Sequence, residues 1–137
     1  MTLPSVSRED SVREFHRAMG HPIDREPDAS IIRLRRILIR EETDELSEEL
    51  SRAAEQLASR GKLDDAIKEN ILKEMADLQY VLSGLAVAFG LPIESAFNRV
   101  HKSNMSKLGP NGLPLYRSDG KIQKGENYQP PDMKGLW

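Results

Sequence analysis

The sequence predicts an all-α fold: a four-helix body followed by a short C-terminal hairpin and an extended tail. Two long stretches carry apolar residues at helical spacing, and a glycine follows each of them. The chain has 137 residues, of which 38% are hydrophobic and 31% charged, a composition that suits one helical domain with much exposed surface. We therefore expect a single domain over 1–137, with a helical body at about 7–107 and a tail at 108–137.

Each predicted helix begins at a capping residue or a proline, and glycines stop the first three. The predicted helices run from Ser7 or Asp10 to Met19, from about Ser30 to Arg60, from Asp64 or Asp65 to Phe89, and from Pro92 to about Lys107.

The C-terminal segment changes character because glycines and prolines interrupt any helix after residue 107. Residues 115–117 and 121–123 can form two short strands joined by a turn at 118–120. A single hairpin is marginally stable alone, so we expect the tail to pack on helices, a partner subunit or a ligand.

Composition excludes several classes of protein. A net charge of −2 gives no global attraction to a nucleic-acid polymer or an anionic membrane, and the absence of cysteine excludes disulfides and thiolate metal sites. The first ten residues lack the apolar stretch of a secretory signal, and the most apolar window, 78–93, is too interrupted to span a bilayer. We expect a cytoplasmic protein with a buried core helix at that window.

Acidic residues stand where helical periodicity calls for core. On the second predicted helix, Glu41 and Glu45 lie at the edge of the apolar arc and Glu42 lies within it. On the third, Glu74 lies at the centre of the apolar face and Asp77 flanks it. Spacings of three and four residues place the acids of each helix on one side.

Buried carboxylates need a neutralising partner, because uncompensated like charges are costly in a low dielectric. Arg35 is the only basic residue near this level on the apolar arc of the second helix. Mg²⁺ and Mn²⁺ prefer carboxylate oxygens, so the acids form a candidate site for two or three ions. The alternative is a solvated acidic surface, which we accept for Asp44 and Glu48.

A basic segment, HKSNMSK at 101–107, follows the acids in the sequence. Lys102, Asn104 and Lys107 are candidates for binding phosphate oxygens and a sugar or base edge, and Tyr116 and Lys124 of the tail extend this set. For Lys107 the alternative is a basic last turn that complements the helix dipole.

The combined pattern, Glu41-Glu42-x-x-Glu45 followed by Glu74-x-x-Asp77 and then HKSNMSK, resembles the signature of MazG-like all-α nucleoside triphosphate pyrophosphohydrolases. That superfamily also holds dimeric dUTPases and phosphoribosyl-ATP pyrophosphatases, and the likeness covers about residues 15–133.

The resemblance implies a helical bundle completed by self-association, as a homodimer or a larger homo-oligomer, and a requirement for Mg²⁺ or Mn²⁺. It implies hydrolysis of a nucleoside triphosphate to the monophosphate and pyrophosphate, as in clearance of unwanted nucleotides from the cellular pool. The metals would lower the pKa of the attacking water, and Glu42 would act as general base while touching a metal.

Among substrates, dUTP is our first expectation, from the likeness to dimeric dUTPases. The alternatives are dCTP, an oxidised nucleotide or phosphoribosyl-ATP with the same chemistry, or a non-catalytic helical regulator that binds metal.

Overall fold

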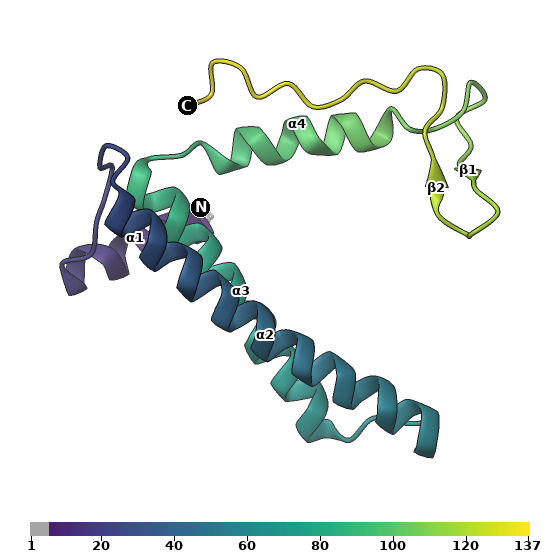
Figure 1. The fold of residues 1–137 in the computed structure, drawn as a ribbon, viewed down its shortest axis with the longest axis horizontal. Coiled ribbons are helices and arrows are strands. Elements are labelled where there is room, and N and C mark those ends of the chain that lie inside the picture. The colour runs from purple at the N-terminus through teal and green to yellow at the C-terminus, as the bar shows by residue number, and fades with distance from the viewer. Residues whose placement is uncertain (1–5) are drawn as a thin grey trace, which may run out of the picture. The chain divides into compact units, whose positions relative to one another are not determined.

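The structure, a computed structural model, describes residues 6–137 and divides into two compact units, one ending at Leu91 and the other beginning at Pro92. The prediction of an all-α fold with a small hairpin is confirmed (Figure 1). The first unit holds α1 (Arg8–Met19), α2 (Ala29–Arg60) and α3 (Asp65–Phe89); the second holds α4 (Ile93–Met105), β1 (Leu115–Tyr116) and β2 (Ile122–Gln123).

Local sequence explains where the helices of the first unit begin and end. Ser7 and Asp10 form a reciprocal capping box: the Ser7 hydroxyl accepts from the Asp10 N–H at 3.0 Å, and the Asp10 carboxylate accepts from the Ser7 N–H at 3.2 Å. α1, α2 and α3 each end at a glycine in the left-handed conformation, Gly20, Gly61 and Gly90, with φ of 69°, 73° and 66°.

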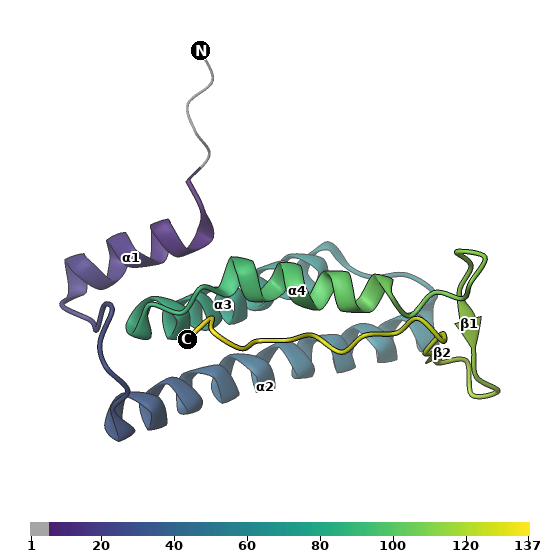
Figure 2. The ribbon, with the colours of Figure 1, turned by 90° about the horizontal axis from the view of Figure 1, so that it is seen from above.

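α2 and α3 lie side by side as an antiparallel pair (Figures 1 and 2). A hydrogen-bonded clamp closes their connection: the Gln56 amide donates to Asp64 Oδ2 at 2.7 Å, and the Asp64 N–H donates to Gln56 Oε1 at 2.6 Å. The Asp64 carboxylate therefore accepts a hydrogen bond from a side chain of α2, and it does not cap the first turn of α3. Near the other end of the pair, the backbone of Gly84 lies against the Arg35 guanidinium. These two contacts fix the register of the helices.

α1 covers the C-terminal half of α3 and buries a polar network. Val12 and His16 are almost fully buried, as is Arg35 on α2. His16 Nδ1 lies 2.7 Å from the Pro22 carbonyl, and Arg35 Nη2 lies 3.4 Å from His16 Nε2. We assign a neutral imidazole in which Nδ1–H donates to Pro22 and Nε2 accepts from Arg35, because a guanidinium can only donate.

In the second unit, the extended tail runs beside α4, and the two-stranded hairpin stands between them in the sequence (Figure 2). The hairpin is antiparallel, with Leu115 opposite Gln123, so the predicted strands and turn are confirmed. The tail is held by a hydrogen bond from Ser103 Oγ to the Gln129 carbonyl, 2.7 Å, and one from Arg99 Nη1 to the Asp132 carbonyl, 2.8 Å.

α4 ends at Met105, two residues before the predicted end near Lys107. The carbonyl of Lys107 instead accepts the Gly125 N–H at 2.8 Å, and the Ser106 hydroxyl donates to the Ser103 carbonyl. The tail thus occupies the Lys107 carbonyl, which a longer helix would use for its own hydrogen bonds. No single helix among residues 6–137 is long and apolar enough to cross a membrane.

Candidate metal and active site

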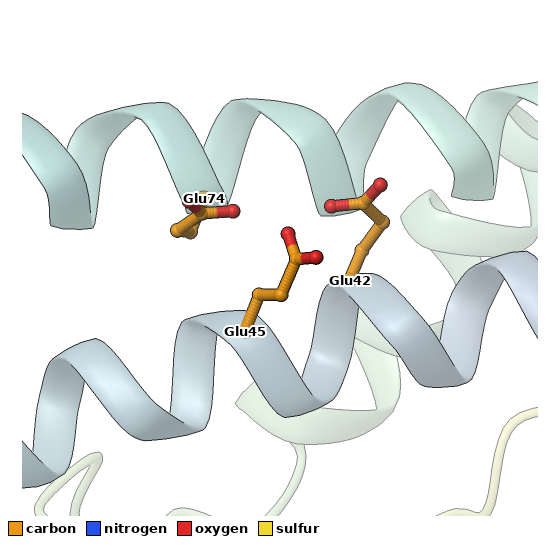
Figure 3. Close-up of side chains that lie close together, drawn as sticks. All are labelled: Glu42, Glu45 and Glu74. Carbon is orange, nitrogen blue, oxygen red and sulfur yellow. The ribbon is translucent and has the colours of Figure 1, made fainter.

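Three of the predicted acids meet between α2 and α3. Glu42 and Glu45 project from α2 and Glu74 from α3, and one carboxylate oxygen of each lies within 4.8 Å of the other two (Figure 3). Their spacing of three residues points Glu42 and Glu45 to the same neighbour, and the clamped register brings Glu74 opposite them. We call these three residues the acid cluster.

The acid cluster leaves carboxylate oxygens without donors. Glu42 and Glu74 are half-buried, and the Oε2 atom of each is buried with no hydrogen-bond partner among the described residues. A buried acceptor that lacks a partner costs about 1–3 kcal/mol, and more when it is charged. Both orphaned oxygens therefore require a cation, a proton or water to complete their surroundings.

The neighbouring carboxylates also change the acidity of the exposed member of the acid cluster. The adjacent Glu74 carboxyl, with which Glu45 can share a proton, and then the negative charge of Glu42 raise the pKa of Glu45 above its ordinary value. A divalent cation between these groups would relieve the same repulsion, because it attracts the charged form of each carboxylate.

Lys73 supplies a counter-charge that the sequence interpretation missed. Its Nζ lies 2.8 Å from Asp77 Oδ2 and 3.2 Å from Glu74 Oε1, and these two carboxylates raise the pKa of the lysine. The sequence interpretation considered a basic partner on the second helix only, and Lys73 lies on α3. The four-residue spacing of Lys73 and Asp77 on a helix is the signal that could have revealed the pair. Arg35, the basic residue considered earlier, lies against His16.

Two of the five predicted metal ligands lie outside the acid cluster. Glu41 is exposed on α2, and Asp77 is half-buried with its carboxylate held by Lys73. Asp44 and Glu48 are also exposed, in agreement with the surface interpretation of these two acids.

Glu49 is a buried acid that falls within the apolar arc of α2, as Glu42 does, but is not among the predicted metal ligands. It is 8% exposed, one of its oxygens pairs with Arg52, and its Oε2 atom is buried without a partner among the described residues. Glu49 lies one helical turn after Glu45, so it extends the line of acids on α2 away from the acid cluster. Its position on the apolar arc was the available signal.

The predicted substrate-binding residues all belong to the second unit. Lys102 and Asn104 are exposed on α4, and Lys107 is half-buried just after it. Tyr116 lies in β1, and Lys124 places its Nζ 4.6 Å from the centre of the Tyr128 ring. Lys102 also lines a cavity of about 290 Å³, the other lining residues being Arg99, Ser103, Ser106, Gln129, Pro130, Pro131 and Asp132. Substrate binding by these five residues stays a prediction.

The acid cluster fits a hard divalent cation by its chemistry. All of its donors are carboxylate oxygens, which Mg²⁺ and Mn²⁺ prefer, and two of these oxygens are buried without another partner. Coordination of an ion would also explain why the chain places such groups between two helices, where apolar side chains would otherwise pack.

Comparison with known proteins bears on this geometry. Residues 12–104, which include the whole acid cluster, match the sequence profile of the family described as phosphoribosyl-ATP pyrophosphohydrolase. The chain belongs to this family. The predicted resemblance is thereby confirmed at the level of the family.

Two individual proteins are also similar to this family member. It is 28% identical over 140 residues to uncharacterized protein L479 of Acanthamoeba polyphaga mimivirus, a match that covers 92% of the chain but only 46% of that longer relative. A crystal structure of a proposed NTP pyrophosphohydrolase from Exiguobacterium sp. 255-15 is 22% identical, with a TM-score of 0.44 over 91% of this chain and 89% of that one.

Proposed function

We propose that the protein is a metal-dependent nucleoside triphosphate pyrophosphohydrolase whose ions are held by the acid cluster. The observation that carries this proposal is that Glu42 and Glu74, brought together from two helices of a pyrophosphohydrolase family member, each bury a carboxylate oxygen without a partner among the described residues. We include Glu41 and Asp77 as further candidate ligands, because each lies within one helical turn of the acid cluster.

The proposed reaction releases pyrophosphate in one step. A bound divalent cation would supply positive charge to offset that of the phosphate oxygens. Glu42 accepts the proton of the attacking water, the bond from the α-phosphorus to the bridging oxygen breaks, and the monophosphate and pyrophosphate leave. The half-buried position of Glu42 keeps bulk water from competing for this proton. No covalent intermediate is needed.

The second unit provides the groups for binding the substrate in this proposal. Lys102 and Lys107 carry positive charge for phosphate oxygens, and the Asn104 amide can both donate to and accept from a sugar or base edge. Tyr116 and Lys124 add an aromatic face and a further cation.

For the substrate itself, we propose dUTP first, on the resemblance to dimeric dUTPases. Phosphoribosyl-ATP is the second candidate, because it gives the matched family its description. Both contain the α–β phosphate linkage that the proposed reaction breaks, so the choice between them rests on the base and sugar.

The test is pyrophosphate release from a panel of nucleotides, including dUTP, dCTP and phosphoribosyl-ATP, with Mg²⁺, with Mn²⁺ and with EDTA. We expect metal-dependent release of pyrophosphate and no diphosphate intermediate. Hydrolysis in ¹⁸O-water should place the label on the monophosphate. Label in orthophosphate would mean attack at the γ-phosphorus, and full turnover after verified removal of metal would refute the metal site.

A matched pair of variants assigns the activity to the acid cluster. Glu45→Gln removes a member of the cluster, whereas Glu48→Gln makes the same chemical change at an exposed glutamate three residues later on α2. We expect the first variant to lose most activity and the second to retain it. Equal activity in both variants would mean that the acid cluster does not carry the reaction. Metal binding by the wild type without turnover of any nucleotide would favour a non-catalytic regulator.

We also propose that the chain self-associates through the α2–α3 pair. Apolar side chains of α2 recur at steps of four or seven residues along one face, and several are half exposed: Ile32 is 44%, Leu50 49% and Leu57 47% accessible. Met75 and Leu82 of α3 are exposed to a similar extent. A soluble protein rarely leaves so many large apolar residues along two adjacent helices uncovered.

Charge favours a second copy of the chain as the occupant of this face. Residues 31–40 of α2 contain four arginines and no acid, whereas residues 41–50 contain six acids and no base. None of those arginines forms an ion pair with a carboxylate among residues 6–137. An antiparallel, two-fold contact between α2 helices would bring each basic half to the acidic half of the partner. Sedimentation of a clean 15.5 kDa species at micromolar concentration would refute self-association.

A further inference from the structure

Lys73 contacts the candidate metal site, and the proposed reaction assigns no role to this side chain. It bridges two acids of α3, lying 3.2 Å from Glu74 Oε1 and 2.8 Å from Asp77 Oδ2. The lysine side chain is 65% exposed, whereas that of Glu74 is only 13% exposed. The ammonium therefore approaches the edge of the acid cluster from the solvent while the carboxylate of Glu74 stays inside.

The neutralisation by Lys73 is partial. Glu42 and Glu45 form no ion pair with it, and the buried Oε2 atoms of Glu42 and Glu74 remain without a partner among the described residues. Lys73 thus balances the α3 side of the site and leaves the α2 side uncompensated. A divalent cation shared by Glu42, Glu45 and Glu74 would balance both sides at once.

The lysine and a metal ion compete for the same two carboxylate groups. The ammonium holds Glu74 Oε1 and Asp77 Oδ2, so an ion that uses Glu74 through both oxygens, or Asp77 through Oδ2, must displace it. A lysine has a flexible four-carbon stem and a strongly hydrated head group, so it can swing into water at small cost. Its exposure shows that no other part of the first unit encloses it.

We propose that Lys73 is an internal counter-ion that holds Glu74 and Asp77 in the metal-free protein and is displaced when a divalent cation binds. This inference rests on the proposed metal site and adds a regulating residue to it. The lysine reduces repulsion among the acids without metal, which favours the folded helix pair. In return it weakens metal affinity, because its positive charge repels the ion and it holds one oxygen of Glu74 and one of Asp77.

The test compares three variants of the full-length protein. Lys73→Gln removes the counter-ion, and Lys73→Arg keeps a cation that can still pair with both acids. Lys68→Gln is the matched control, because Lys68 lies on α3 as well but pairs with Asp65, at 3.7 Å, away from the acid cluster. Mn²⁺ affinity is measured by competition with a chelator starting from the loaded protein, so the metal-free variant need not be stable. Thermal midpoints are measured in EDTA and in Mn²⁺.

We expect Lys73→Gln to bind Mn²⁺ about three-fold more tightly or better, the scale of a partly exposed ion pair. Its thermal midpoint should fall in EDTA and recover in Mn²⁺, whereas Lys73→Arg and Lys68→Gln should resemble the wild type. Weaker binding by Lys73→Gln would show that the lysine orients the acids for metal, and unchanged binding would show that it does not affect the ion. In either case the inference would fail while the metal site stands. An equal gain in Lys68→Gln would mean a general charge effect. No Mn²⁺ binding by the wild type would overturn both proposals.

Discussion

Gly84→Ala is a sharp test of the packing that positions α2 against α3. A Cβ built on Gly84 would lie 2.7 Å from Arg35 Nη1 and 3.4 Å from His16 Nε2. The first distance is too short for any real contact, and Arg35 is only 5% exposed, so its guanidinium has little room to withdraw. Overpacking of this kind costs about 1–3 kcal/mol, whereas alanine in place of glycine inside a helix gains about 1 kcal/mol. We expect a net loss of about 1 kcal/mol in the free energy of unfolding.

The contact can be isolated with a double-mutant cycle. Arg35→Met removes the guanidinium that the new methyl group would strike, and it also removes a buried charge that has no carboxylate partner among the described residues. In that background Gly84→Ala should stabilise the protein by up to about 1 kcal/mol, because only the helix-propensity gain remains. The coupling between the two sites should therefore be about 1–3 kcal/mol.

Urea unfolding followed by far-ultraviolet circular dichroism, at one protein concentration for all four proteins, measures the cycle. Wild-type stability of Gly84→Ala would mean that the Arg35 side chain moves freely enough to accept the methyl group. An equal effect with Met at position 35 would mean that Arg35 is not what opposes the methyl group, and either result would refute the predicted clash.

Three further predictions concern other parts of the chain. Glu74→Gln should keep the fold, raise the thermal midpoint in EDTA by removing repulsion, and lower Mn²⁺ affinity by about tenfold or more, as calorimetry can show; unfolding with unchanged metal content would make Glu74 structural. Burial, as the largest cause, lowers the pKa of His16 below its ordinary 6.5, so the unfolded chain binds more protons than the native protein in acid. The free energy of unfolding should therefore fall as the pH drops below about 6.5, and His16→Gln should flatten this dependence in urea titrations at pH 5–7. Ser103→Ala should speed amide exchange in the tail by about fivefold, the effect of one hydrogen bond worth about 1 kcal/mol, and leave exchange in α2 and α3 unchanged.

Much of the first unit could be predicted from the sequence because its determinants are local. The positive φ at Gly20, Gly61 and Gly90 is a conformation that favours glycine over other residues, so each stop signal was readable in the chain itself. The placement of Glu74 among apolar neighbours on a helix was equally readable, since it depends only on the number of residues per turn.

The partners of the acids could not be predicted in the same way. A helical wheel gives the direction in which a residue leaves the helix axis, but the end of a long side chain depends on rotamers and on what the neighbouring helix leaves open. For this reason Arg35 was considered near the acids although it packs on His16, and Lys73 was overlooked although it contacts two of them. Glu41 and Glu42 are adjacent in the sequence, yet only Glu42 reaches the acid cluster. Successive side chains leave a helix about 100° apart, and α3 lies on the side of Glu42.

The clamp between Gln56 and Asp64 has a consequence for how this chain tolerates insertions and deletions. The two hydrogen bonds between Gln56 and Asp64 hold the ends of the connection together. Extra residues at 61–63 could therefore bulge outward without moving Glu45 away from Glu74. One extra residue inside α2 between Glu45 and Gln56 would instead turn the two ends of that segment by about 100° relative to each other. Either the clamp or the acid cluster would then lose its counterpart on α3. Relatives should therefore vary in the length of the connection while the spacing from each acid to the clamp stays constant.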